Sequence, residues 1–247
     1  MVAVQRCLFF VTLHGSPSDA IALVEGDNVI TTVVTAQDGS TTATYTITVT
    51  RTKPVIVNTG TLLILNSTYG TPSVSGTFNV SGTNMLEGIL VAPPIEFEVS
   101  ADNVTFTDNI TIGAAGTISA TPVYIRLKGN IGVGNYIGNI VLSSNSAITV
   151  NSPQLSGTVS KAALIVTADD KSKPYGSANP TLTVSYSGFV NGDTEASLDV
   201  TPSISTTATA SSPVGLYAIT ASGASSPNYS ISYVDGNLTV GHVALIV

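Results

Sequence analysis

The chain has 247 residues, a formal net charge of −7, one cysteine and no tryptophan, and 9% of its residues are charged. Nucleic-acid binding needs several cations on one face, but the densest basic group is the pair Lys171 and Lys173. A single cysteine excludes an internal disulfide framework, and no apolar run reaches the ~18 residues that span a bilayer. We therefore expect neither a nucleic-acid partner nor membrane insertion.

Thr, Ser, Gly, Val and Ile are abundant, whereas the helix formers Lys, Glu and Gln are scarce. Because β-branched side chains suit pleated surfaces and no apolar run has helical spacing, an all-β fold is predicted. The length is sufficient for two or three small domains. We therefore expect tandem small β domains.

The chain opens with MVAVQRCLFFVTL, in which one cation, Arg6, precedes a short apolar stretch. A signal peptide is one interpretation, but the stretch lacks an A-x-A cleavage site. The favoured interpretation is a strand within a domain. Cys7 is then expected to be a buried or incidental thiol, not a nucleophile.

Apolar residues recur with a period of two, as expected for half-buried strands. This alternation is clear in residues 43–50, 95–100, 123–129, 181–189, 216–223 and 229–236. The segment 95–100 places Ile95, Phe97 and Val99 on the expected core face. The segment 123–129 places Val123, Ile125 and Leu127 there. Turn signals occur at 38–40, 190–193 and 235–237. The pattern is typical of antiparallel β-sandwiches.

One nine-residue segment occurs twice. Thr158–Val166 (TVSKAALIV) and Thr239–Val247 (TVGHVALIV) share six identities at an offset of 81 residues, and Thr48–Val57 is a looser copy. Each copy reads as a last strand, a polar hinge of about three to five residues and an apolar first strand, which favours a semi-rigid string of domains. The predicted units are 1–52, 53–160 and 161–241, with 242–247 starting a further repeat.

The first unit contains L-x-E-G-x-N-x-I at 23–30 and A-x-D-G-S at 36–40, and it ends in T-Y-T-I-T-V-T-R at 44–51. On these segments it resembles the C-terminal half of the bacterial cadherin-like β-sandwich domain. The calcium-binding motifs of true cadherins are absent. Since residues 1–52 are too few for a whole sandwich, we expect a partial domain with an open sheet edge.

The middle unit is similar to Ig-like repeats of large secreted Bacteroidetes proteins. This similarity rests on FNVSGTNM at 78–85, FEVSADNVTF at 97–106, VYIRLKG at 123–129 and LSGTV at 155–159. It implies an Ig-like β-sandwich over residues 53–160.

The third unit carries a Tyr175-Gly176 turn, the segment GFVNGD at 188–193, the pair Asn228-Tyr229, and Gly236. It resembles an MBG domain, a family with a mucin-binding connection that recurs in tandem in bacterial surface adhesins. The resemblance implies a compact β-rich module. Together the three resemblances imply an adhesin-like or stalk protein of the bacterial cell surface.

Residues suited to catalysis are few. The two histidines, His14 and His242, lie near opposite ends of the predicted array, so neither suits a Ser-His-Asp triad, and both are expected to be solvated. Zinc, thiol-redox, nucleophile-elbow and phosphate-loop motifs are absent, and Gly132 and Gly134 belong to a predicted strand turn. We expect no enzyme activity and no cofactor.

Asp169 and Asp170 form the best carboxylate cluster, with Asp193, Glu195 and Asp199 nearby in sequence. Calcium requires about six or more oxygens, and the D-x-D-x-D-G loop is missing. Backbone bonding in a turn is therefore the favoured role of the two adjacent aspartates. A calcium site there remains the alternative.

Sugar-binding sites usually contain exposed aromatics, and Tyr175, in a Pro-Tyr-Gly turn, is the best candidate for exposure, although core packing is favoured. No ligand-binding residue is assigned. The N-x-S/T sequons follow from a composition rich in Asn, Ser and Thr; they begin at Asn66, Asn79, Asn103, Asn109, Asn228 and Asn237.

The predicted function is that of a non-enzymatic, modular segment of a bacterial extracellular or surface protein. It would be a monomeric string of stalk or adhesion modules, with glycans or surface proteins as candidate partners. The alternative is a set of accessory, non-catalytic modules of a large secreted hydrolase. Val243–Val247 is expected to be unpaired, or paired opportunistically with a sheet edge.

Overall fold

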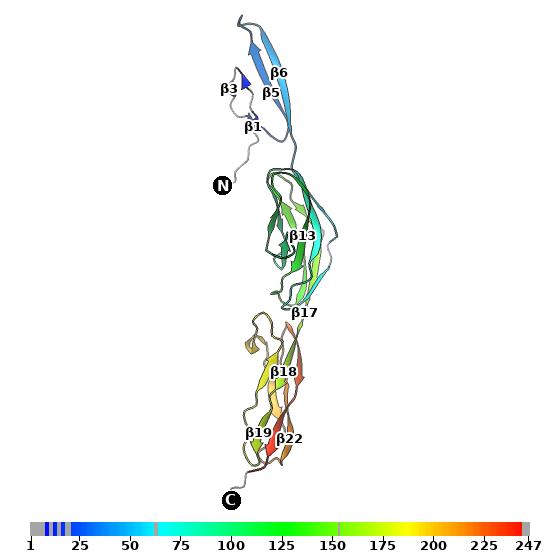
Figure 1. The fold of residues 1–247 in the computed structure, drawn as a ribbon, viewed down its shortest axis with the longest axis vertical. Coiled ribbons are helices and arrows are strands. Elements are labelled where there is room, and N and C mark those ends of the chain that lie inside the picture. Colours follow the sequence, from blue (N-terminus) through cyan, green and yellow to red (C-terminus); the bar gives the residue numbers. More distant parts are fainter. Residues whose placement is uncertain are drawn as a thin grey trace.

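The computed structural model describes residues 8–9, 12–13, 16–17, 21–61, 64–152 and 154–243. These residues are almost entirely strands and connections, as the composition predicts. The sheets formed by residues 26–51, 55–160 and 162–241 follow one another along the long axis in chain order (Figure 1). Within the described residues, no sheet combines strands from two of these three regions.

The N-terminal region is dominated by a hairpin of β5 (Gly26–Thr35) and β6 (Thr42–Arg51), paired from Gly26↔Arg51 to Thr35↔Thr42. At its turn, the Thr41 hydroxyl, followed by the backbone N–H groups of Thr41 and Ser40, lowers the pKa of Asp38 to about 2. In the part that is described, no third strand pairs with the hairpin. This agrees with the expected open edge.

Two shorter pairs precede the hairpin. They are β1 (Leu8–Phe9) with β4 (Ile21–Ala22), and β2 (Thr12–Leu13) with β3 (Ser16–Pro17). Cys7 and His14, discussed above, lie outside the described residues.

Residues 55–160 form a β-sandwich, named here the middle sandwich, with three sheets. The first is β11 (Phe97–Ser100), β13 (Gly116–Leu127), β9 (Gly76–Met85) and β7 (Val55–Thr59). The second is β12 (Ile110–Ile112), β10 (Ile89–Ala92), β15 (Val141–Ser143) and β16 (Val150–Asn151). The third is β14 (Gly134–Gly138), β17 (Leu155–Ser160) and β8 (Leu65–Thr68).

The alternation in β13 gives the predicted core face, since Val123, Ile125 and Leu127 are fully buried. Phe97 and Val99 of β11 are also buried, as predicted. The prediction was wrong for Ile95, which is 80% exposed. Ile95 lies in a turn closed by the N–H of Phe97 and the carbonyl of Pro94, so the strand period does not apply to it.

Residues 162–241 form a second sandwich, named here the C-terminal sandwich, which has two sheets. One sheet is β20 (Val184–Ser187), β18 (Ala162–Ala168) and β23 (Tyr229–Val234). The other is β19 (Lys171–Pro174), β24 (Gly236–Gly241), β22 (Gly215–Ser222) and β21 (Ser203–Thr206). A 3₁₀ turn, η1 (Glu195–Ser197), lies between β20 and β21.

The sheets are less uniformly antiparallel than the alternation predicts. Three pairs are parallel, namely β8 with β17, β18 with β23, and β19 with β24. The turn signal at 235–237 does not close a hairpin, because β23 and β24 belong to different sheets. The chain crosses between sheets at Gly236, where a Cβ would lie 2.3 Å from the carbonyl oxygen of Ala168.

The connection between the two sandwiches is shorter than predicted. β17 ends at Ser160 and β18 begins at Ala162, so Lys161 alone separates them. One cluster of buried apolar residues runs from the middle sandwich into the C-terminal sandwich and includes Tyr69 and Tyr229. The sheets are therefore separate, but the hydrophobic core is continuous across the joint.

The buried face of β13 provides a stability test. Leu127→Ala should destabilise the middle sandwich by about 3 kcal/mol, because the cavity adds to the lost burial. Ile137→Ala in β14, at a side chain that is 64% exposed, is the matched control and should change little. Urea unfolding measures both variants. Equal effects would contradict the assigned core face.

Candidate functional site: the joint between the sandwiches

The carboxylates singled out in the sequence bond to the protein itself. Asp169 accepts a hydrogen bond from the Thr183 hydroxyl, and its Oδ2 lies 4.0 Å from the Lys171 ammonium. Asp170 Oδ1 accepts the N–H of Asn237 at 2.6 Å. Within the described residues, no three His, Cys, Asp or Glu side chains gather as metal ligands. The two aspartates thus bond residues that are 14 and 67 positions away in the chain, which differs from the local backbone bonding in a turn that the sequence favoured.

The other candidates are dispersed. Glu195 and Asp199 are exposed, and Asp193 contacts residues far from the Asp169-Asp170 pair. His242 is exposed directly after β24, and Val243 is 60% exposed and outside any strand. Residues 244–247 lie outside the described residues, so the expectation for Val243–Val247 can be compared only at its first residue.

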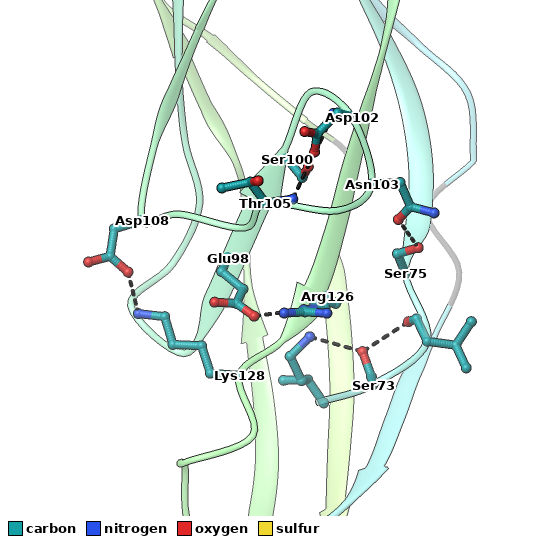
Figure 2. Close-up of polar contacts among 12 residues, drawn as sticks. Ser73, Ser75, Glu98, Ser100, Asp102, Asn103, Thr105, Asp108, Arg126 and Lys128 are labelled. Atoms are coloured by element: carbon teal, nitrogen blue, oxygen red, sulfur yellow. Dashed lines mark hydrogen bonds and ion pairs between the residues drawn. The ribbon is translucent and has the colours of Figure 1, made fainter. Parts of the chain in front are cut away.

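A polar cluster on the middle sandwich holds one loop, residues 101–109 (Figure 2). Arg126 Nε lies 2.7 Å from Glu98 Oε1, and the guanidinium carbon of Arg126 lies 3.7 Å from the centroid of the Phe106 ring. Lys128 Nζ lies 2.6 Å from Asp108 Oδ1. These opposite charges are paired across strand and loop, and such contacts order the loop.

Asp102 closes the tip of the same loop. Its Oδ1 accepts the backbone N–H groups of Thr105 and Val104, each at 2.8 Å, and the Ser100 hydroxyl at 2.7 Å (Figure 2). These bonds, led by that from Thr105, lower the pKa of Asp102 to about 2. The carboxylate therefore remains charged at physiological pH, with one oxygen occupied by the loop.

A further polar site among the described residues lies between the sandwiches. Tyr69, which follows β8, and Tyr229, which begins β23, are 8% and 2% exposed. The Tyr69 hydroxyl donates to Asp193 Oδ2 at 3.0 Å, and the Tyr229 hydroxyl donates to the same oxygen at 2.7 Å. One carboxylate oxygen of the C-terminal sandwich thus accepts a phenol from each sandwich.

Aromatic rings pack against one another at this joint. The rings of Tyr69 and Tyr229 are 5.5 Å apart at 89°, and those of Phe189 and Tyr229 are 5.4 Å apart at 90°. Edge-to-face pairs of this kind contribute about 0.5–1.5 kcal/mol beyond the buried area. The geometry therefore combines hydrogen bonding with close aromatic packing.

Backbone groups complete the joint. Gly70 has a φ of +87°, and a Cβ there would lie 2.4 Å from Val190 Cγ2, so its lack of a side chain allows Val190 to pack directly on the backbone. Asn191 Nδ2 donates to the carbonyl of Gly129 at 3.2 Å. The loop 190–193 of the C-terminal sandwich is thus seated on the end of the middle sandwich.

A second set of bonds lies beside this loop. Asn228 Oδ1 accepts the N–H of Val133 at 3.1 Å, and the carbonyl of Asn228 accepts the N–H of Ala162 at 3.0 Å. Asn228 therefore bonds both the middle sandwich and the first strand of the C-terminal sandwich.

The sequence singled out the segments 188–193 and 228–229 without giving them a role, and it missed Tyr69. A usable signal existed, because the dipeptide Tyr-Gly occurs twice, at 69–70 and at 175–176. Only the structure shows that the first copy faces Asp193.

The described fold defines a class of protein: tandem β-sandwich modules joined by a closely packed interface. Residues 164–239 match the family model of the MBG domain (YGX type), and residues 2–52 match that of the cadherin-like beta sandwich domain. Of the three resemblances expected from the sequence, those to the MBG and cadherin-like domains are confirmed. These two segments are therefore similar to the MBG domain and to the cadherin-like domain, both of which are non-catalytic β modules.

Comparison with curated proteins finds no significant match. Among solved structures, the chain is similar to the Bacillus anthracis TIE protein at 10% identity and a TM-score of 0.30, covering 75% of this chain and 40% of that one. It is similar to Clostridium thermocellum CbhA fibronectin(III)-like modules at 13% identity and a TM-score of 0.23, covering 76% of this chain and 94% of theirs.

A third similar structure is the Bacteroides ovatus mixed-linkage glucan utilization locus SGBP-B in complex with a mixed-linkage heptasaccharide. The identity is 13% and the TM-score 0.19, with 95% of this chain and 59% of that one covered. The part of the chain that the structure describes contains no helix with the length and apolarity needed to cross a membrane.

The joint should respond to alkaline pH. Burial, and the bond to Asp193, raise the pKa of Tyr229 from 10 to about 12. Because the folded state holds this proton more tightly than the unfolded chain, its stabilising effect is complete below pH 10 and is lost as pH rises through 12. Thermal unfolding should therefore show a steeper fall in stability over this range for the parent chain than for Tyr229→Phe.

Tyr45→Phe is the control for this experiment, since Tyr45 is 60% exposed on the N-terminal hairpin. Its profile should follow that of the parent chain. If Tyr229→Phe also followed the parent profile, the buried hydroxyl would not be the source of the alkaline transition.

Proposed function

We propose that this chain is a non-enzymatic stalk segment of a bacterial extracellular or surface protein. Its modules occupy residues 1–52, 53–160 (an Ig-like sandwich) and 161–241, and residues 242–247 begin a further repeat. The two matched domain families, both non-catalytic, support this setting. The work of such a segment is to hold other regions of the protein away from the cell.

The observation that carries the proposal is the joint at Asp193. A stalk must resist bending between its modules, and bending at Lys161 would separate the Tyr69 hydroxyl from Asp193 and remove Val190 from Gly70. Leaving a buried donor or acceptor unpaired costs about 1–3 kcal/mol. A single connecting residue and a continuous apolar core oppose the same movement.

The charged residues of the middle sandwich are consistent with this role. The charges of Arg126 and Lys128 are paired with Glu98 and Asp108, and these pairs hold strand and loop together. Low surface charge reduces salt-sensitive contacts with other molecules.

Adhesion to glycans or surface proteins is a secondary part of the proposal. Saturable binding of the full chain to immobilised mucin glycoprotein tests it.

Substitution of the shared carboxylate tests the stalk directly. Asp193→Ala leaves the buried Tyr69 hydroxyl without its acceptor and leaves the Tyr229 hydroxyl only the Val190 carbonyl at 3.3 Å, so the unfolding free energy should fall by about 1–3 kcal/mol. Small-angle X-ray scattering should show a shorter maximum dimension, because the sandwiches then sample bent arrangements. Both changes should appear in the full chain.

Asp199→Ala, at an exposed carboxylate of the same sandwich, is the matched control and should change neither stability nor shape. If Asp193→Ala lost stability but kept the extended shape, the joint would be part of the core without setting the orientation of the modules. That result would contradict the proposed stalk role.

A further inference from the structure

The turn Tyr175–Gly176 repeats the structural position of Tyr69–Gly70. In the middle sandwich, the last strand β17 pairs in parallel with β8, with Thr158↔Asn66 and Ser160↔Thr68. In the C-terminal sandwich, the last strand β24 pairs in parallel with β19 in the same register, with Thr239↔Ser172 and Gly241↔Pro174. In both cases Tyr-Gly directly follows the paired strand.

The hydrogen bonds of the two turns also correspond. The N–H of Tyr69 donates to Ser160 O at 2.9 Å, and the N–H of Tyr175 donates to Gly241 O at 2.9 Å. The N–H groups of Gly70 and Gly176 donate across to Gly129 O at 3.1 Å and Ala210 O at 3.2 Å.

Each turn is closed by a further bond of the same kind, from Thr71 N to Thr68 O and from Ser177 N to Pro174 O. The two glycines have φ values of +87° and +80°. The two ends therefore present the same backbone surface.

The two turns differ in what covers them. Tyr69 is 8% exposed, and Val190 lies against Gly70. Tyr175 is 49% exposed, and a Cβ on Gly176 would meet nothing within 4 Å. The surface that receives a neighbouring module at one joint is thus open at the far end of the C-terminal sandwich.

We propose that Tyr175–Gly176 is the docking site for a further module of the MBG kind, and that it receives that module's equivalent of the loop 190–193. The apolar residue of the loop would pack on Gly176, and its aspartate would accept the Tyr175 hydroxyl, as Val190 and Asp193 do at the existing joint. This inference rests on the proposed stalk function and extends it to the next joint.

The C-terminal sandwich carries both halves of such a contact. Its loop 190–193 and Tyr229 contact the preceding module, and Tyr175–Gly176 lies at its opposite end, beside Gly241. A surface and its complement at opposite ends of one unit form a head-to-tail interface that repeats without closing on itself. A copy of the same module is therefore the occupant that the geometry favours.

The sequence at the end of the C-terminal sandwich agrees with a further module of the same kind. Thr239–Val247 repeats Thr158–Val166, the segment that passes through the existing joint into β18. The segment that follows β24 beside Tyr175–Gly176 therefore repeats the residues that lead from the middle sandwich into the C-terminal sandwich.

The open turn is held in its receiving conformation. The side chain of Lys173 in β19 is buried, and its Nζ donates to the carbonyls of Ser177 at 2.9 Å and Thr209 at 2.6 Å. Ser212 Oγ accepts the N–H of Thr209 at 2.8 Å, which fixes the adjoining loop. Because the surface is already ordered, docking loses little conformational entropy there.

An extended chain tests the proposal. A second copy of residues 167–241 is joined after Val247, which keeps the register of the repeat. The chain has no tryptophan, so Tyr217→Trp in the added copy alone reports the unfolding of that copy by fluorescence. Tyr175→Ala in the original copy should lower the unfolding midpoint of the added copy by about 5 °C. In the chain without the added copy, Tyr175→Ala should have no comparable effect.

A double-mutant cycle identifies the contact. Tyr175→Phe, which keeps the ring, is combined with Asp193→Ala in the added copy. If the two groups are bonded, the combined shift is smaller than the sum of the single shifts. Tyr45→Ala, at a tyrosine that is 60% exposed on the N-terminal hairpin, is the control and should shift nothing.

Additive shifts, or an added copy insensitive to Tyr175→Ala, would overturn the proposal. If Tyr175→Ala instead abolished mucin binding by the full chain while leaving the added copy unchanged, the turn would be a ligand site and the proposal would be wrong. The effect of Asp193→Ala at the existing joint reports on the stalk separately, so failure of one idea is distinguishable from failure of the other.

Discussion

One carboxylate oxygen, Oδ2 of Asp193, accepts hydrogen bonds from two buried tyrosines that belong to different sandwiches. The rings of the two tyrosines pack edge to face, and a change in the angle between the sandwiches would separate the buried Tyr69 hydroxyl from its acceptor. The contact of Val190 with Gly70 adds a steric limit in the same place. The mutual orientation of the two sandwiches depends on this group of residues.

The remaining polar chemistry is also directed at holding the protein together. Arg126 is paired with Glu98 and stacked on Phe106, Asp102 closes its own loop, and Lys173 bonds two carbonyls in the interior. These groups are distributed over separate loops and joints, and each one holds neighbouring segments together.

Sequence patterns predicted the fold where the determining forces are local. The period of two placed Val123, Ile125 and Leu127 in the core, because neighbouring residues in a strand face opposite sides. The same rule failed at Ile95, which lies in a turn. The turn residues at 235–237 did not indicate a hairpin correctly, because Gly236 lets the chain cross closely between two sheets. Alternation and turn residues do not specify which strands become partners, so the three parallel pairs were not foreseen.

The amino-acid sequence alone specifies the β class, most core faces and the two domain families, since these depend on residue type and short-range spacing. It does not specify the joint. Tyr69 and Asp193 are 124 positions apart, and neither residue is unusual in its own segment. Their meeting depends on where β8 ends beside β17 and on the single residue that leads into β18. Only the packing of whole modules brings these ends together, so the tertiary structure decides the site.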